Sequence, residues 1–306
     1  MSVIVLGSIN LDMTARVDHI VGPGETLVAS DVLVSPGGKG ANQALAARRM
    51  GADTVLVGSV GDDAFAMQAL RLLRQAGVDL SRIQVVDRAT GLAWVAVDRA
   101  GQNAITVIPG ANAVTGAEAL EAVRRLLGPR DTLVLQLEIP LETVAAAVNL
   151  ARAAGARVLL DPAPAPSALP DACWQVDILT PNQGEAGQLL GGPAVRDVRE
   201  AKAAARALRQ RGPKVAVVKL GEAGVVWATA QGVFYLPAEP VTAVDSTGAG
   251  DAFAGALAAR LDAGDPLPEA MRLANRAAAV STTRRGAQVS FPDREEVAAW
   301  PDGPSR

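Results

Sequence analysis

Short apolar segments rich in Val, Ile and Leu alternate along this chain with longer Ala-, Leu- and Arg-rich segments of helical period. A strand that is followed by a helix and then by another strand favours parallel pairing, with helices covering the sheet. We predict strands at residues 3–6, 54–58, 132–137, 157–161, 178–180 and 214–220, and helices at residues 41–50, 64–75, 117–127, 141–153, 196–211, 251–261 and 268–283. The sequence therefore predicts an α/β fold with a mostly parallel central sheet. Ligands of such sheets bind beyond the carboxyl ends of the strands, so polar residues there are the first candidates for a site.

Two regions interrupt this alternation, at residues 13–35 and 83–108. Both have the pattern of β-hairpins, and in the second, residues 92–97 and 104–108 flank a turn-prone segment. Strands inserted into the amino-terminal half of an α/β domain favour a lid or a dimerisation sheet, and ordinary edge hairpins are the alternative. No clear linker or repeat divides the chain, so we predict one domain over residues 1–306.

The composition excludes several kinds of site. One cysteine, Cys173, and one histidine, His19, leave no intrachain disulfide, no multi-histidine zinc site and no Cys/His catalytic pair. A net charge of −3 with 3% aromatic residues argues against a nucleic-acid partner. The longest uncharged stretch, residues 100–117, is rich in turn residues, and the N-terminus has no basic leader. We therefore predict a cytoplasmic protein without membrane contact that acts on a small molecule.

The strongest local signal is DSTGAGDAF at residues 245–253, a glycine-rich turn that leads into an Ala-rich helix. The first amides of such a helix point at a ligand, and the helix dipole adds about half a positive charge, so phosphate is the expected ligand. Asp251 beside a phosphate is unfavourable unless it takes a proton from an attacking hydroxyl. A positioned base is worth about 10²- to 10⁴-fold in rate. A helix cap by Ser246 or Thr247, with an acidic first turn, is the alternative.

A second glycine cluster, GGKGAN at residues 37–42, precedes a predicted helix. It does not match a Walker phosphate loop. Both glycine clusters also lack the last glycine of a dinucleotide fingerprint, which argues against an NAD-linked dehydrogenase. Lys39 and Asn42 instead offer donors for the hydroxyl groups of a sugar, and Gly38 permits close approach. A plain turn at the start of a helix is the alternative.

Polar side chains also follow several predicted strands. Asn10 and Asp12 lie two residues apart after the first strand, and a carboxylate there suits two neighbouring sugar hydroxyls. Glu138 ends the strand at 132–137 in the same topological position. Glu185 follows the strand at 178–180 and suits Mg²⁺, which favours one or two carboxylates with water and phosphate. Surface capping is the alternative for Glu185.

Six motifs occur in this order along the chain: GSINLD, GGKGAN, QLE, TPNQGE, KLGEAG and DSTGAGDAF. Together they resemble the ribokinase-like (PfkB) family of carbohydrate kinases over nearly the whole chain. The resemblance implies a three-layer αβα sandwich with a small β-sheet lid that commonly serves as a homodimer interface. It also implies an ATP-dependent kinase, with Mg²⁺ and an activating K⁺, that converts D-ribose to D-ribose 5-phosphate. Deoxyribose, fructose or a nucleoside are alternative acceptors, and a non-catalytic sugar or nucleotide sensor is an alternative of another class.

The resemblance further implies a role for each matching residue. The general base would be Asp251, beside an anion site formed by the amides of Gly248, Ala249 and Gly250. The sugar would be held by Asn10, Asp12, Gly38, Lys39, Asn42 and Glu138. Nucleotide and phosphates would lie near Asn182, Glu185, Lys219, Gly221, Gly224, Gly250 and Asn275, with Glu185 close to Mg²⁺ through water. Potassium would be surrounded, partly by backbone carbonyls, by Asp245, Thr247, Ser281, Arg284, Gly286 and Ser290. Lys219 and Asn275 depart from the family pattern, in which a small hydroxyl residue and an imidazole are expected.

Overall fold

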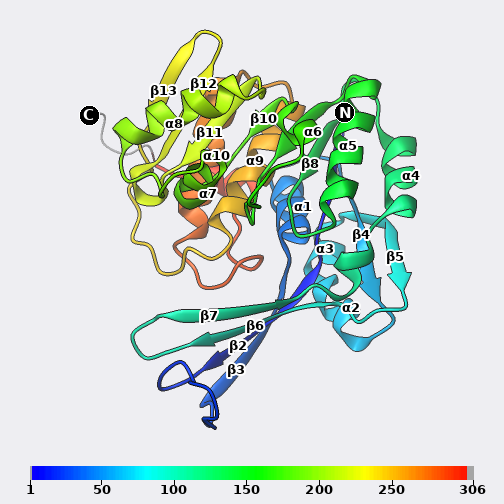
Figure 1. Cartoon of the computed structure of the whole chain (residues 1–306), viewed down its shortest axis with the longest axis vertical. Helices are drawn as coiled ribbons and strands as arrows, with labels where there is room; N and C mark the ends of the chain where they lie inside the picture. The colour runs from blue at the N-terminus through cyan, green and yellow to red at the C-terminus, as the bar shows by residue number, and fades with distance from the viewer. Residues whose placement is uncertain (1, 302–306) are drawn as a thin grey trace.

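The computed structural model describes residues 2–301 and contains a nine-stranded sheet with the order β13-β12-β11-β10-β9-β8-β1-β4-β5 (Figure 1). Its strands are β1 (Val3–Leu6), β4 (Thr54–Gly61), β5 (Asp79–Val86), β8 (Thr132–Leu135), β9 (Arg157–Leu160), β10 (Ile178–Leu179), β11 (Val215–Lys219), β12 (Val225–Thr229) and β13 (Gly232–Leu236). Pairing is parallel from β11 to β5, and antiparallel where β12 and β13 extend the edge beyond β11. The predicted mostly parallel sheet is confirmed.

Helices cover both faces of this sheet, because the strands are apolar on both sides. In β1, Val3 and Val5 enter one core cluster, whereas Ile4 and Leu6 enter the other. The first cluster lies under α1 (Lys39–Arg49), α2 (Ala64–Ala69), α3 (Arg71–Ala76), α9 (Ala249–Asp262), α10 (Leu267–Ser281) and α11 (Arg294–Ala299). The second lies under α4 (Ala117–Leu126), α5 (Leu141–Ala154), α6 (Asp171–Trp174), α7 (Gln183–Leu189) and α8 (Val198–Gln210). The three-layer αβα sandwich is therefore confirmed.

A separate sheet of four strands, in the order β3-β2-β6-β7, projects below the large domain in the view of Figure 1. It consists of β2 (Asn10–Arg16), β3 (Asp31–Gly37), β6 (Gly91–Val97) and β7 (Asn103–Ile108). Within the second inserted range, residues 83–86 belong to β5 and pair with β4 in the large sheet, so the small sheet there begins at Gly91. In the first range, β2 already starts at Asn10, which places Asn10 and Asp12 at the base of the small sheet.

Several boundaries differ from those predicted. The helix predicted over residues 64–75 is two helices, α2 and α3, that meet at Leu70. Helix α7 was not predicted, because its seven residues include two glycines, and its start depends on a capping box between Asn182 and Glu185. Two short 3₁₀ helices, η1 (Gly110–Val114) and η2 (Gly221–Ala223), complete the fold. Within residues 2–301, every helix is too short or too polar to cross a membrane.

Candidate active site

The predicted base and sugar residues, together with Lys219, lie where the carboxyl ends of β1, β8, β9 and β11 meet the first turns of α1 and α9. Asn10, Glu138 and Lys219 follow or end three of these strands, and Asp251 lies in the first turn of α9. Glycines allow α1 to approach β1 closely. Gly38 has φ +86°, and a Cβ there would lie 2.6 Å from Asn10 N. The GGKGAN turn therefore both starts a helix and brings its residues against the segment that joins β1 to β2.

The first turn of α9 has the geometry of an anion site. Its N-cap is Gly248, at φ +78°, and no side chain caps the helix, so the expected alternative of a cap by Ser246 or Thr247 is wrong. Within residues 2–301, the amides of Gly248, Gly250 and Asp251 donate to no protein acceptor, whereas Ala249 N donates to Ser246 O at 3.1 Å. Free amides and the dipole of α9 therefore provide the positive end that a phosphate requires, and Ala249 is the one predicted amide that is already engaged.

Asp251 is buried among polar groups, and both of its carboxylate oxygens accept hydrogen bonds from amide side chains. Asn42 Nδ2 donates to Oδ2 at 2.8 Å, and Gln43 Nε2 donates to Oδ1 at 3.0 Å. Burial, above all, raises the pKa of Asp251, and the charge of Lys39 opposes that shift. A carboxylate has about four lone-pair sites, so Asp251 still has room to accept from a substrate hydroxyl.

The charges of several carboxylates act on Lys39. Asp251 is the main cause that raises the pKa of Lys39, and Asp161, Glu138 and Glu185 add to it. Burial, followed by the charges of Glu138 and Asp251, raises the pKa of Asp12 to about 7. Glu138 is fixed by Ser8 Oγ at 2.5 Å and by the amide of Lys39 at 3.2 Å. The predicted sugar residues therefore share one strongly charged environment.

Four side chains that the sequence did not single out complete this environment. Asn112 Nδ2 donates to Asn10 Oδ1 at 2.8 Å and so orients Asn10. Gln43 Nε2 donates to Asp161 Oδ2 as well as to Asp251, and Gln136 Nε2 donates to Gln43 Oε1. Asp161 directly follows β9, so its position at the end of a parallel strand was the available signal.

On the side expected for the nucleotide, Asn182 and Glu185 cap α7 reciprocally. Asn182 Oδ1 accepts from Glu185 N at 2.9 Å, and Glu185 Oε2 accepts from Asn182 N at 2.8 Å. The capping alternative for Glu185 is thus what the structure shows. Burial, and secondly the charge of Asp161, raises the pKa of Glu185, and Lys219 opposes that shift. Glu185 therefore lies within the electrostatic reach of the carboxylates around Asp251.

Lys219 points into the site. Asn275 and Gly224 contact the backbone at the end of β13, and Gly221 lies in the turn after β11. Lys219 Nζ lies 2.8 Å from Asp161 Oδ1. Asn275 Nδ2 donates to Pro237 O at 2.8 Å, and a Cβ on Gly224 would lie 2.2 Å from Leu236 O. Asn275 and Gly224 therefore both contact the segment that follows β13. Gly221 has φ +58° and nothing near its Cβ position, so its role is in the turn itself.

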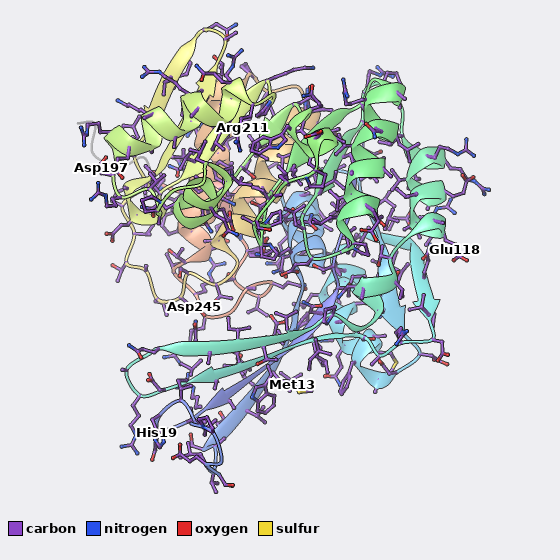
Figure 2. The ribbon with its side chains drawn as sticks, in the orientation of Figure 1. Met13, His19, Glu118, Asp197, Arg211 and Asp245 are labelled. Carbon is purple, nitrogen blue, oxygen red and sulfur yellow. The ribbon has the colours of Figure 1, made fainter. Side chains whose placement is uncertain are left out.

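The residues expected around potassium lie in two loops that hydrogen bonds of Asp245 join, apart from Ser281, which ends α10. Asp245 Oδ1 accepts from Thr247 Oγ1 at 2.6 Å, and Oδ2 accepts from Gly286 N at 2.8 Å. These bonds hold the pKa of Asp245 below its ordinary value, although burial acts in the opposite direction. Figure 2 shows Asp245 at the side of the large domain that faces the small sheet.

The other predicted potassium residues turn to protein partners. Ser281 Oγ donates to Ala278 O and Ser290 Oγ to Ala287 O, both at 2.8 Å, while Arg284 pairs with Glu296 on α11. The side chains of these three residues are therefore engaged, so backbone carbonyls are the atoms that they have free to offer a cation. Within residues 2–301, no three His, Cys, Asp or Glu side chains are grouped to hold a metal ion by themselves.

Comparison with known proteins connects this geometry to a family. The family described as pfkB family carbohydrate kinase matches residues 1–294. The chain is 35% identical to the ribokinase of Haemophilus influenzae over 294 residues, which cover 96% of each protein. It is 36% identical to the deoxyribokinase of Salmonella typhi over 299 residues, which cover 97% of each. The solved structure of Arabidopsis thaliana ribokinase complexed with ribose and ATP has a TM-score of 0.88 and 30% identity, with 97% of each chain covered. These likenesses extend over nearly the full length of the chain.

Proposed function

Because the chain belongs to the pfkB family of carbohydrate kinases, as an ATP-dependent sugar kinase of the ribokinase type, we propose that it phosphorylates the 5-hydroxyl of D-ribose. The observation that carries the proposal is the position of Asp251. Its buried carboxylate lies in the first turn of α9, where the amides of Gly248 and Gly250 donate to no protein acceptor within residues 2–301. A base and an anion site thus share one helix turn, and the carboxylates around Lys39 lie next to them.

In this proposal Asp251 is the general base. It accepts the proton of the sugar hydroxyl while that oxygen forms a bond to the γ-phosphorus and the bond to the ADP leaving group breaks. Burial raises the pKa of Asp251 and so strengthens its affinity for that proton. The amides of Gly248 and Gly250 and the dipole of α9 stabilise the charge on the transferred group. Ala249 would contribute only if its bond to Ser246 O lengthened.

The sugar would lie between the small sheet and α1, held by Asn10, Asp12, Gly38, Lys39, Asn42 and Glu138. Asp12 is the acceptor for two neighbouring hydroxyls, and Lys39 and Asn42 are donors. Asn42 also contacts the base, because its Nδ2 donates to Asp251. A ribose that pairs with Asn42 and Asp12 would therefore present its 5-hydroxyl close to the base.

Mg²⁺ is proposed to accompany the nucleotide near Glu185, through water. The site fits a cation, because five carboxylates (Asp12, Glu138, Asp161, Glu185 and Asp251) interact there with two lysines (Lys39 and Lys219). Such an acidic excess repels free phosphate, and Mg²⁺ commonly binds through one carboxylate, water and phosphate oxygens. When bound, Mg²⁺ neutralises phosphate charge. Asn182, Gly221, Gly224 and Asn275 are proposed to border the nucleotide.

Potassium is proposed to bind in the loops that Asp245 joins, surrounded by Asp245, Thr247, Ser281, Arg284, Gly286 and Ser290. A buried acceptor in the same segment, Gln288 Oε1, has no hydrogen-bond donor within residues 2–301. Gln288 Nε2 donates to Asn42 Oδ1 at 3.1 Å, so this loop connects directly to the side chain that contacts the base. Rates measured in KCl and in tetramethylammonium chloride test this proposal, and equal rates would contradict it.

We also propose that the small sheet is a lid over the sugar and the interface of a homodimer. Seven of its large apolar side chains are exposed: Val32, Leu33, Val34, Trp94, Ile105, Val107 and Ile108. They lie on β3, β6 and β7, and exposed apolar side chains of this kind suit a second copy of the same sheet. Light scattering of Trp94→Glu beside the unchanged protein tests this, and a monomer in both would contradict it.

The experiment that tests the substrate is ATP consumption with D-ribose, 2-deoxy-D-ribose, D-fructose and a nucleoside. The curated relatives include a ribokinase and a deoxyribokinase at nearly equal identity, so deoxyribose is the second candidate acceptor. A site built for a hydroxyl can reject the analogue without it by about 10⁴-fold or more. We expect ribose to give the highest kcat/KM. A higher value for 2-deoxyribose would assign a deoxyribokinase, and binding without turnover of any sugar would indicate a sensor.

A further inference from the structure

The ion pair between Lys219 and Asp161 is the part of the site that neither the sugar nor the base requires. Lys219 Nζ lies 2.8 Å from Asp161 Oδ1, and the two side chains are 14% and 2% exposed. Removing two charges from water costs several kcal/mol per ion, and a hydrophobic pair of similar volume is often at least as stable. Stability therefore gives little reason for these two charges to be buried here, which favours a role in function.

The position of the ammonium group supplies that reason. A Cβ on Gly250 would lie 3.3 Å from Lys219 Nζ, so the ammonium borders the first turn of α9. The Gly250 amide donates to no protein acceptor within the described residues. An ammonium has three donors, and in that same part of the chain its acceptor is Asp161. Two N–H bonds therefore remain for a group that binds against this turn.

Asp161 is held in a fixed orientation by its own partners. Its Oδ2 accepts from Gln43 Nε2 at 3.0 Å, and Thr180 Oγ1 lies 3.4 Å from its Oδ1. The same Gln43 nitrogen donates to Asp251 Oδ1 at 3.0 Å. The position of Lys219 is thus tied, through Asp161 and one shared amide, to the position of Asp251.

We propose that Lys219 is a catalytic residue whose ammonium contacts the transferred phosphoryl group, and that Asp161 is the positioning residue that orients it. The inference rests on the proposed kinase function. As the bond from the γ-phosphorus to ADP breaks and the bond to the sugar oxygen forms, the proton passes to Asp251 and negative charge remains on the phosphoryl oxygens. A pre-positioned cation stabilises that charge. The lysine thus places a positive charge next to the phosphoryl oxygens, which a small neutral hydroxyl residue at this position could not do.

Three variants test the proposal against a purely structural ion pair: Lys219→Met, Asp161→Asn and the double variant with both changes. Lys219→Met is expected to lower kcat by about 10²- to 10³-fold, the usual effect of removing one group that stabilises transition-state charge. ADP, which lacks the transferred group, is expected to bind within about threefold of the unchanged enzyme. Asp161→Asn is expected to lower kcat by about tenfold, because the lysine remains but is less well placed. Lys219→Arg is expected to recover part of the lost rate.

The double variant separates the two explanations. It leaves no uncompensated buried charge, so its Tm is expected to return close to that of the unchanged protein, while kcat stays as low as in Lys219→Met. A double variant with normal kcat would overturn the proposal, because the pair would then serve only stability. Equal losses of ATP and ADP affinity with unchanged kcat would also overturn it. An unchanged enzyme that phosphorylates no sugar would instead contradict the proposed function itself.

Discussion

Charged residues lie both at the carboxyl ends of the parallel strands, here called the carboxyl edge, and at their amino ends, the amino edge. The charges at the carboxyl edge are buried, whereas those at the amino edge are in water. At the carboxyl edge, Asp161 and Asp251 are nearly inaccessible. At the amino edge, Arg130, Arg152 and Lys214 line surface cavities of about 490 Å³ and 470 Å³, and all three are exposed. None of the predicted site residues lines either cavity. Burial is costly for a charge, so buried charges that cluster at one edge indicate chemistry there.

Strand β11 has a Lys–Asp ion pair at each of its ends. Lys214, just before the strand, pairs with Asp177 at 2.6 Å, and the side chains are 79% and 22% exposed. Lys219, at its other end, pairs with Asp161 at a similar distance but in near-complete burial. An exposed pair contributes little to stability, whereas breaking a buried one costs several kcal/mol. The same two residue types therefore have different consequences at the two ends of one strand.

The largest expected effect at the carboxyl edge is that of Asp251→Asn. The amide has nearly the shape of the carboxylate but cannot accept the substrate proton, so kcat is expected to fall by about 10²-fold or more. ATP binding, followed by calorimetry, is expected to persist. Asp177→Asn at the amino edge is the matched control, with kcat within about twofold of the unchanged enzyme. Near-normal turnover by Asp251→Asn would remove the chemical difference between the edges.

Two glycines with positive φ extend the comparison to the backbone. Gly38→Ala would place a Cβ 2.6 Å from Asn10 N, and we expect a loss of about 3 kcal/mol in the free energy of unfolding together with a higher KM for the sugar. Gly155, which ends α5 at the amino edge, has φ +72° and its nearest neighbour at 3.6 Å. Gly155→Ala is expected to cost only about 1 kcal/mol. Equal losses in urea unfolding would contradict the close approach of α1 to β1.

The pKa of Asp12 predicts a stability that depends on pH. Because that pKa is about 7 in the folded protein and 3.8 for a fully hydrated Asp, as in the unfolded chain, the folded state binds the proton more tightly. Stability is therefore expected to fall as the pH rises from about 4 to about 7. Asp12→Asn removes the free-energy cost of a buried negative charge. It is therefore expected to stabilise the protein by about 1–3 kcal/mol at pH 8 and to change the stability little at pH 4.

The same substitution separates stability from function. Asp12→Asn is expected to raise the KM for the sugar at pH 8, because the acceptor for two hydroxyls is lost. Urea unfolding at both pH values and sugar kinetics on the same samples measure the two effects. An equal stability change at pH 4 and pH 8 would contradict the electrostatic origin assigned to Asp12.

The smallest expected effect is that of Lys214→Met, the counterpart of Lys219→Met. The Lys214 side chain is 79% exposed, so we expect a change of less than about 0.5 kcal/mol in unfolding free energy and an unchanged kcat. Thermal unfolding and ATP consumption measure both. A large loss of activity from Lys214→Met would show that the amino edge also contributes to the reaction.

Local sequence signals located part of this site. The glycine turns around Lys39 and before Asp251 were visible because a helix start against a strand end requires glycine, as Gly38 shows. The capping box of Asn182 and Glu185 also has a local pattern, an Asn followed three residues later by Glu, and capping was the alternative given for Glu185. Asp161 had a positional signal, because it directly follows the parallel strand β9. Gln43 and Gln136 gave no local signal, because a buried amide is distinguished only by its partners.

The amino-acid sequence by itself determined the α/β fold, the two glycine turns and the carboxylate in the first turn of α9. These follow from periodicity and from the conformations that glycine allows, which are properties of neighbouring residues. Only the tertiary structure decided that Gln43 donates to both Asp161 and Asp251, and that Lys219 faces Asp161. Those contacts join segments more than 50 residues apart, and their strength depends on burial, which exists only once the strands and helices have packed together.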